Sequence, residues 1–235
     1  MPFQPDRRQM FSILGAVAIV AAGLAWWAPW ATPEDPAPAV ASATTVVAQA
    51  TTAAEPATAP GAAILGDVVL GDDAAPVTVI EYASFTCPHC ASFHANTYPE
   101  FKAAYIDTGK VRFIMREVYF DREGLWASMI ARCAGAGGFY PIADQLMKQQ
   151  SVWAKAAREN NRDAIRKIGR LNGVSNDQLD ACLSDPGYEK ALVEAYQRNV
   201  AADEVDSTPT FLINGKKHPG NLPFGDLAAL LDAQL

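Results

Sequence analysis

Basic residues and cysteines are both scarce in this sequence. Its 235 residues carry 19 Lys and Arg against 26 Asp and Glu, which gives a formal net charge of −7. Because phosphate binding needs clustered Lys and Arg, a nucleic-acid partner is not expected. Four cysteines are too few for a disulfide scaffold that replaces a hydrophobic core. With 50% hydrophobic residues, the composition predicts instead a globular domain of medium size.

The N-terminal residues 1–31 have the pattern of a membrane segment rather than of a folded domain. Arg7 and Arg8 precede an uncharged, apolar run over residues 10–31, and a helix of this length spans a bilayer core. Tryptophans typical of a membrane interface stand at the far end of the run: Trp26, Trp27 and Trp30. We therefore predict an uncleaved anchor whose positive start stays in the cytoplasm, with the rest of the chain outside.

Cleavage of this segment is the alternative, because small residues at 41–43 and 48–50 fit the pattern of a cleavage site. A twin-arginine signal is less favoured, since Asp6 precedes the arginines and Met10 stands where a bulky aromatic is usual. Residues 32–63 are rich in Ala, Thr and Pro and lack periodicity, which predicts a linker, either a tether or part of a processed leader. In each case the body of the protein lies outside the cytoplasm, where disulfides persist.

Strand and helix patterns begin at residue 64. We expect an edge strand within 64–70, a buried strand over 77–82, a helix from the cysteines to about residue 107 with a kink at Pro99, and a strand over 111–115. Residues 122–202 contain helical signals only. We expect two more strands, over 210–213 and 216–218, and a last helix with an apolar face formed by Leu227, Leu230, Leu231 and Leu235. The predicted order is β-β-α-β, a helical block, and then β-β-α, which is an α/β fold.

The motif Cys87-Pro88-His89-Cys90 carries the chemistry. Two cysteines three residues apart, after a strand and at a helix start, predict a redox pair in an exported protein. A zinc site would need two more ligands, and although His94 lies one turn beyond Cys90, no fourth ligand is evident. A purely structural disulfide is also disfavoured, because closing so small a loop removes little chain entropy. We predict no metal and no other cofactor.

The position of Cys87 predicts a stabilised thiolate. The free N–H groups and the positive dipole end of the following helix favour the anion and lower the pKa of the thiol. Pro88 suits the first helical turn, and His89 can stabilise the thiolate by donating to the sulfur of Cys87 or by adding positive charge. A stabilised thiolate makes the disulfide an oxidant and Cys87 a good leaving group. Cys87 is thus the predicted nucleophile and Cys90 the resolving cysteine.

These residues resemble the active site of the DsbA-like thiol:disulfide oxidoreductases, a branch of the thioredoxin superfamily. The resemblance covers residues 64–235 and implies a thioredoxin fold with an inserted helical domain, at about 122–202, between its βαβ and ββα halves. It also implies a carboxylate beneath the active site at Glu81, which would relay a proton to or from Cys90. Counting by two along the strand places Glu81 on the face of Val77 and Val79; a solvated edge residue is the alternative.

Residues Ser207-Thr208-Pro209-Thr210 resemble the family's cis-proline segment, which would lie opposite the cysteines. The cis isomer is implied by the resemblance and not by the residues. Thr208 and Pro209 would then bind an extended client by strand addition, whereas the alternative is a trans proline that starts a strand. Threonine before this proline also occurs in isomerases, while the best-known oxidases carry valine.

The remaining cysteines, Cys133 and Cys182, both fall in the helical block. Neither has a nearby second cysteine or a clear activating cation, so we favour a structural disulfide between them. A second redox pair and two buried thiols are the alternatives. A bridge that closes a loop of about 50 residues would stabilise the fold by roughly 4 kcal/mol in the chain-entropy model.

The resemblance implies a periplasmic thiol:disulfide oxidoreductase that donates the Cys87–Cys90 disulfide to exported proteins. It implies reoxidation by a DsbB- or VKOR-like membrane partner. We expect a monomer, because the isomerases of this superfamily carry a dimerisation domain where this chain has an anchor and a linker. One alternative is an isomerase or reductase kept reduced by a membrane electron donor. Another is a holdase-like binding module with an inert disulfide.

Overall fold

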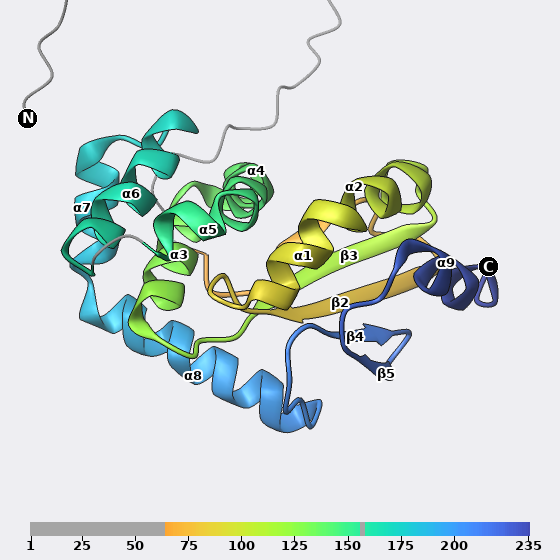
Figure 1. The fold of residues 1–235 in the computed structure, drawn as a ribbon. Helices are drawn as coiled ribbons and strands as arrows, with labels where there is room; N and C mark the ends of the chain where they lie inside the picture. Colours follow the sequence, from red (N-terminus) through yellow and green to blue (C-terminus); the bar gives the residue numbers. More distant parts are fainter. Residues whose placement is uncertain (1–63, 156–157) are drawn as a thin grey trace, which may run out of the picture. The chain divides into compact units, whose positions relative to one another are not determined.

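The computed structural model describes residues 64–155 and 158–235 (Figure 1). The predicted membrane segment at 1–31 and the predicted linker at 32–63 lie outside the described residues. Within the described ranges, no helix combines the length and the apolar character that crossing a bilayer requires.

The strands in the described part of the chain form one five-stranded mixed sheet, in the order β1-β3-β2-β4-β5. β2 and β3 run parallel, whereas the pairs β1–β3, β2–β4 and β4–β5 are antiparallel. The apolar, β-branched sequence of β2 suits its place at the centre of the sheet. The bounds of the strands are β1 (Val69–Leu70), β2 (Val77–Ala83), β3 (Val111–Glu117), β4 (Thr210–Ile213) and β5 (Lys216–Pro219).

The helices fall into three groups along the chain. Between β2 and β3 lie α1 (Pro88–Asn96), α2 (Tyr98–Phe101) and the π-helical turn η1 (Lys102–Ile106). Between β3 and β4 lie α3 (Arg122–Cys133), α4 (Gly135–Lys148), α5 (Gln150–Trp153), α6 (Arg158–Leu171), α7 (Asn176–Leu183) and α8 (Pro186–Ala202). After β5 comes α9 (Phe224–Asp232). The predicted order of β-β-α-β, a helical block and β-β-α is therefore confirmed.

The two faces of the sheet pack against different helices. On one face, the ring of Phe211 in β4 lies 4.7 Å from the ring of Phe93 in α1, inside the main hydrophobic core. On the other face, Tyr82 of β2 belongs to a smaller cluster that is covered by Tyr196 and Val200 of α8. Figure 1 shows α8 and α1 on opposite sides of the sheet. This alternation follows from the period of two along a strand.

The helix expected from the cysteines to residue 107 is divided at Thr97. Pro99 lies in the first turn of α2, where the missing N–H of a proline leaves no helical hydrogen bond unmade. The chain therefore starts a new helix at Tyr98 rather than continuing α1 with a kink. The last helix, α9, begins at Phe224, directly after Pro223, and ends at Asp232, so it carries the expected Leu227, Leu230 and Leu231 but not Leu235.

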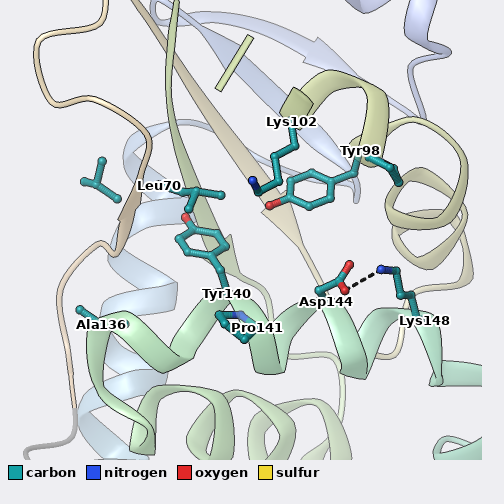
Figure 2. A pocket seen from close by; sticks show the side chains of 11 residues that line it. Leu70, Tyr98, Lys102, Ala136, Tyr140, Pro141, Asp144 and Lys148 are labelled. Atoms are coloured by element: carbon teal, nitrogen blue, oxygen red, sulfur yellow. Dashed lines mark hydrogen bonds and ion pairs between the residues drawn. The ribbon is translucent and has the colours of Figure 1, made fainter. Parts of the chain in front are cut away.

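A hollow of about 730 Å³ lies beside the edge strand, between α2 and α4. Figure 2 shows the side chains that line it, among them Tyr98 from α2 and Tyr140 from α4. Its charged rim includes Lys148, whose amine lies 2.7 Å from the carboxylate of Asp144. None of the described cysteines lines this hollow.

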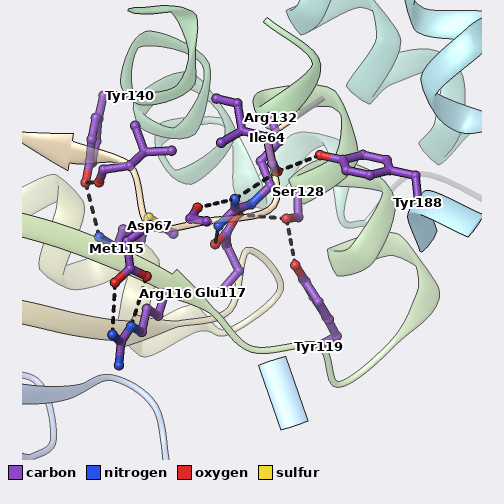
Figure 3. Close-up of polar contacts among 12 residues, drawn as sticks. Ile64, Asp67, Met115, Arg116, Glu117, Tyr119, Ser128, Arg132, Tyr140 and Tyr188 are labelled. Atoms are coloured by element: carbon purple, nitrogen blue, oxygen red, sulfur yellow. Dashed lines mark hydrogen bonds and ion pairs between the residues drawn. The ribbon is translucent and has the colours of Figure 1, made fainter. Parts of the chain in front are cut away.

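The edge strand is shorter than the apolar pattern over 64–70 predicts, because only Val69 and Leu70 pair with β3. The residues before β1 offer their carbonyl groups to side chains of the helical block instead (Figure 3). Arg132 donates to the carbonyls of Ile64 and Gly66, Tyr188 donates to that of Ile64, and Tyr140 donates to that of Val68. Arg132 is itself buried against Glu117, with its Nη2 2.6 Å from the Oε2 of that residue. Strand periodicity alone does not reveal this mode of attachment.

Candidate active site

The two cysteines of the CxxC motif lie where β2 gives way to α1. Cys87 is the N-cap residue of α1, and Pro88 occupies the first helical turn. The backbone N–H of Cys87 donates to the carbonyl of Ser84 at 3.1 Å, which closes the turn between strand and helix. Both cysteines are free thiols. Cys87 keeps 8% of its surface exposed, whereas Cys90 is fully buried at 0%, so only Cys87 can meet a partner sulfur.

The segment before β4 faces these cysteines across the end of the sheet. The bond between Thr208 and Pro209 is cis. The thiol of Cys87 donates to the carbonyl oxygen of Thr208 over 3.5 Å. The antiparallel pairing of β2 with β4 sets this approach, because it aligns Tyr82 with Thr210 just above the proline. Residues separated by more than a hundred positions in the sequence thus meet at one site.

The surroundings of Cys87 strongly favour its thiolate. They lower the pKa of Cys87 from 9.0 to about 5. The largest cause is a hydrogen bond from Cys90, and the backbone N–H groups of Cys90 and His89 act in the same direction, while burial acts in the opposite direction. At neutral pH this cysteine is therefore a thiolate, which is the form that attacks and leaves in disulfide exchange.

Cys90 has the opposite tendency. Burial raises the pKa of Cys90 far above its ordinary value, and the hydrogen bond to Cys87 and the charge of Glu81 act in the same direction. A thiolate formed at Cys90 would therefore capture a proton at once. Any exchange that creates or consumes this thiolate needs a proton donor or acceptor close by.

Glu81 is a carboxylate whose charge acts on Cys90, so it is a candidate for this proton donor and acceptor. It is 0% exposed and lies on the buried face of β2, so the predicted face is correct and the alternative of a solvated edge residue is wrong. Its Oε2 is hydrogen-bonded to Nε2 of His94 at 2.9 Å. His94 stands one helical turn after Cys90 on α1 and is itself buried. The proton-relay role of Glu81 stays a prediction.

His89 contributes to the site differently from the expectation. Its side chain is exposed, and it acts on the Cys87 thiolate through its backbone N–H. The imidazole is thus accessible to solvent. Pro88, also exposed, fixes the first turn of α1 beside it.

Two residues that the sequence did not single out as functional also support the site. The sequence indicates His94 only as a possible zinc ligand, because its spacing of one turn after Cys90 does not show that it meets Glu81 on β2. Gln150, in the helical block, is buried and donates from Nε2 to the carbonyls of Phe85 at 2.8 Å and Cys87 at 2.9 Å. No local pattern reveals Gln150, because α5 meets the active-site turn only through the tertiary fold.

The other cysteines, Cys133 and Cys182, are joined by a disulfide, as expected. Cys133 is the last residue of α3 and Cys182 lies in α7, with their Cα atoms 6.2 Å apart. Both are buried, at 1% and 6% exposure, so the bond links two helices of the block away from solvent.

Comparisons with known proteins agree with this geometry. The thioredoxin family model matches residues 64–233. A protein of Rickettsia bellii, provisionally named a protein-disulfide oxidoreductase, is 35% identical over 167 residues, which are 71% of this chain and 63% of the relative. This chain thus spans about three fifths of that relative's length.

Solved structures extend the comparison to the fold. Alpha-DsbA1 of Wolbachia pipientis is 28% identical and superimposes with a TM-score of 0.67, over 73% of this chain and 92% of that one. Oxidised BdbD of Bacillus subtilis shares the fold at 19% identity and a TM-score of 0.64, over 74% of this chain and 95% of its own. The chain belongs to the thioredoxin family, as a DsbA-like member of that superfamily with an inserted helical region.

Proposed function

We propose that this protein is a thiol:disulfide oxidoreductase that donates the Cys87–Cys90 disulfide to exported proteins. The observation that carries the proposal is the opposite behaviour of the two thiols: the site lowers the pKa of Cys87 to about 5 and raises that of Cys90. A stabilised thiolate in the reduced form makes the disulfide a strong oxidant. The provisional name of the Rickettsia bellii relative supports the same class of reaction.

The exchange would proceed in two steps. A client thiolate attacks the sulfur of Cys87, so that a mixed disulfide forms and Cys90 leaves as a thiolate that must be protonated. The client's second thiolate then attacks the client sulfur of the mixed disulfide, and Cys87 leaves as its stabilised thiolate. The client loses two electrons and the enzyme gains them, which leaves Cys87 and Cys90 reduced.

The client would bind in an extended conformation against Thr208 and Pro209. The Thr208 side chain is half-buried beside the Cys87 sulfur, and the cis bond places its backbone at the rim of the site. Backbone groups in this position can pair with a peptide strand without reading its sequence. Such pairing suits an enzyme that acts on many unfolded clients.

The same proposal includes the setting of the reaction. We place the domain of residues 64–235 in the periplasm, exported by residues 1–31 and joined to them by the linker at 32–63. Retention on the inner membrane by residues 10–31 would keep it near a DsbB- or VKOR-like partner that reoxidises it. We expect it to act as a monomer.

The equilibrium redox potential of the Cys87–Cys90 couple in glutathione buffers tests the proposal. A donor should have a potential well above the value of about −270 mV that is typical of thioredoxin. The protein should also oxidise reduced ribonuclease faster than it reduces insulin. A potential near that of thioredoxin would contradict the donor role.

A role as an isomerase or reductase is the second candidate, and the residue that favours it is Thr208 before the cis-proline. An isomerase kept reduced by a membrane donor would rescue scrambled ribonuclease better than it oxidises the reduced form. Exchange of Thr208 for valine should then increase oxidation at the expense of isomerisation.

A further inference from the structure

Three buried polar atoms lack a hydrogen-bond partner among the described residues, and all three lie around the two reactive sulfurs. They are Oε1 of Glu81, Nδ1 of His94 and Oγ1 of Thr208. Buried polar groups are normally paired, because an unpaired one destabilises the fold. Because these unpaired atoms lie together near the reactive cysteines, we infer that they make hydrogen bonds or transfer protons during the reaction.

The first two atoms belong to one hydrogen-bonded pair. Nε2 of His94 lies 2.9 Å from Oε2 of Glu81, and the two side chains are 2% and 0% exposed. Each partner therefore uses one polar atom on the other and keeps one atom free. Since both groups can gain and lose a proton, the pair can hold one extra proton on either partner and is electrically neutral when it does.

The pair is also close to its reaction partner. His94 follows Cys90 by four residues on α1, so the two side chains lie on the same face of the helix. The charge of Glu81 acts on Cys90 and helps to raise the pKa of that thiol. The other reactive cysteine of the motif, Cys87, is already stabilised as a thiolate and needs no acid or base.

An aromatic ring packs against the histidine of the pair. The ring of Tyr98 lies against the His94 ring, with centroids 4.7 Å apart and an interplanar angle of 35°. Tyr98 also lines the hollow between α2 and α4 (Figure 2). Tyr98 thus contacts the histidine of the buried pair and also lines the hollow.

We propose that His94 is a positioning residue that holds Glu81 and shares its proton, so that the two act as one donor and acceptor for Cys90. The inference rests on the proposed function, because it assigns the proton transfer of that exchange. When a client thiolate attacks Cys87 and Cys90 leaves, the pair gives its proton to the Cys90 thiolate. When the enzyme is reoxidised, the pair takes the proton from the Cys90 thiol as its sulfur attacks the mixed disulfide at Cys87 and expels the partner thiolate.

Reoxidation of the reduced protein by oxidised glutathione separates the steps that matter. In the first phase the Cys87 thiolate attacks glutathione disulfide, and in the second phase Cys90 must lose its proton to resolve the mixed disulfide. Acid quenching followed by mass spectrometry measures both phases, because the glutathione adduct appears and then disappears. Cys90→Ser provides the reference in which the adduct is not resolved.

His94→Gln is the decisive variant, because an amide can still donate to Glu81 but can neither take nor give a proton. We expect an unchanged first phase, an unchanged thiolate titration of Cys87 at 240 nm, and a second phase slowed about 100-fold, the lower range of what a positioned acid–base group contributes. The matched control is His218→Gln, since His218 lies on β5, two strands from Glu81, and should leave both phases unchanged. A second phase at the wild-type rate in His94→Gln would overturn the inference.

Glu81→Gln and the double variant keep the test decisive if His94→Gln folds poorly. Because the two residues act as one unit, each single variant and the double variant should show the same slow second phase. Independent, multiplying effects would overturn the shared-proton pair, as would a slowing of both phases together with a shifted Cys87 titration. Failure of the proposed function would look different from these outcomes. The redox potential of the wild-type Cys87–Cys90 couple would then lie near that of thioredoxin, while glutathione disulfide would still react in two phases.

Discussion

The two cysteine pairs of this protein have the same chemical groups but lie in different surroundings. Cys87 and Cys90 are free thiols at the start of α1, where Cys87 is 8% exposed, Cys90 is fully buried and unpaired polar atoms lie close by. Cys133 and Cys182 form a disulfide between α3 and α7, and both sulfurs are buried in the helical block.

The contrast teaches that burial and partners, rather than the presence of two cysteines, decide what a pair can do. A helix N-terminus and hydrogen bonds favour the anion at Cys87, so that its bond to Cys90 is easily broken. The second pair links residues 49 positions apart in sequence, where a bond restricts the unfolded chain. Reactivity belongs to the first pair and stabilisation to the second.

Removal of the reactive sulfur should have the largest effect. We expect Cys87→Ser to abolish ribonuclease oxidation and insulin reduction, because a serine hydroxyl neither attacks nor leaves in disulfide exchange. Circular dichroism should show an unchanged fold. The matched control is Cys133→Ser/Cys182→Ser, which should keep its exchange activity at a temperature where it is folded; loss of activity there would break the division of roles.

The titration of Cys87 should show the next largest effect. Absorbance at 240 nm of the reduced protein should rise with a midpoint at a pH of about 5, against 9.0 for an ordinary thiol. Replacing Cys90 by alanine should raise the pKa of Cys87, because the hydrogen bond from Cys90 is the main stabiliser of the thiolate. A midpoint that does not move in this variant would assign the stabilisation to the helix instead.

The same lowered pKa makes the stability of the reduced protein depend on pH. Since the folded pKa lies below the unfolded one, the thiolate stabilises the reduced fold fully above the unfolded value of 9.0. This contribution shrinks as the pH falls and is gone below about 5. As the pH is lowered from about 9 to about 5, the Tm of the reduced protein should therefore decrease relative to the Tm of the oxidised protein.

The Cys133–Cys182 disulfide should stabilise the fold measurably, but by less than the Cys87 thiolate does. In a Cys87→Ala/Cys90→Ala background, reducing agent should lower the free energy of unfolding by about 4 kcal/mol, the chain-entropy value for a loop of this length. That loss corresponds to a Tm lower by roughly 8–16 °C for a domain of this size. A Tm that is insensitive to reductant would mean that the second pair does not stabilise the fold.

Gln150 should have the smallest effect, because it acts through two hydrogen bonds only. Gln150→Met keeps the volume but leaves the carbonyls of Phe85 and Cys87 without this donor. We expect a loss of about 1–3 kcal/mol in the free energy of unfolding, measured by urea denaturation. Gln149→Met is the matched control, since Gln149 bonds within its own helical segment to Gln145.

The comparison between the pairs also separates what could be predicted from what could not. The sequence predicted the order of strands and helices, the buried face of β2 and the reactive motif, because periodicity and helix-start chemistry are local properties. The extent of β1 was not, since side chains of Arg132 and Tyr188 compete for the carbonyls that a strand would use. The break at Thr97 depended on how one proline is placed between two helices.

The sequence by itself determined which atoms can react, because a strand, two cysteines and a proline at a helix start place one thiol at the positive end of α1. Only the tertiary structure decided how those atoms are tuned. It brought Thr208, which precedes β4, against Cys87, Gln150 of the helical block against the active-site turn, and His94 of α1 against Glu81 of β2. Local patterns could not reveal these contacts, since each joins segments whose proximity depends on the packing of the whole domain.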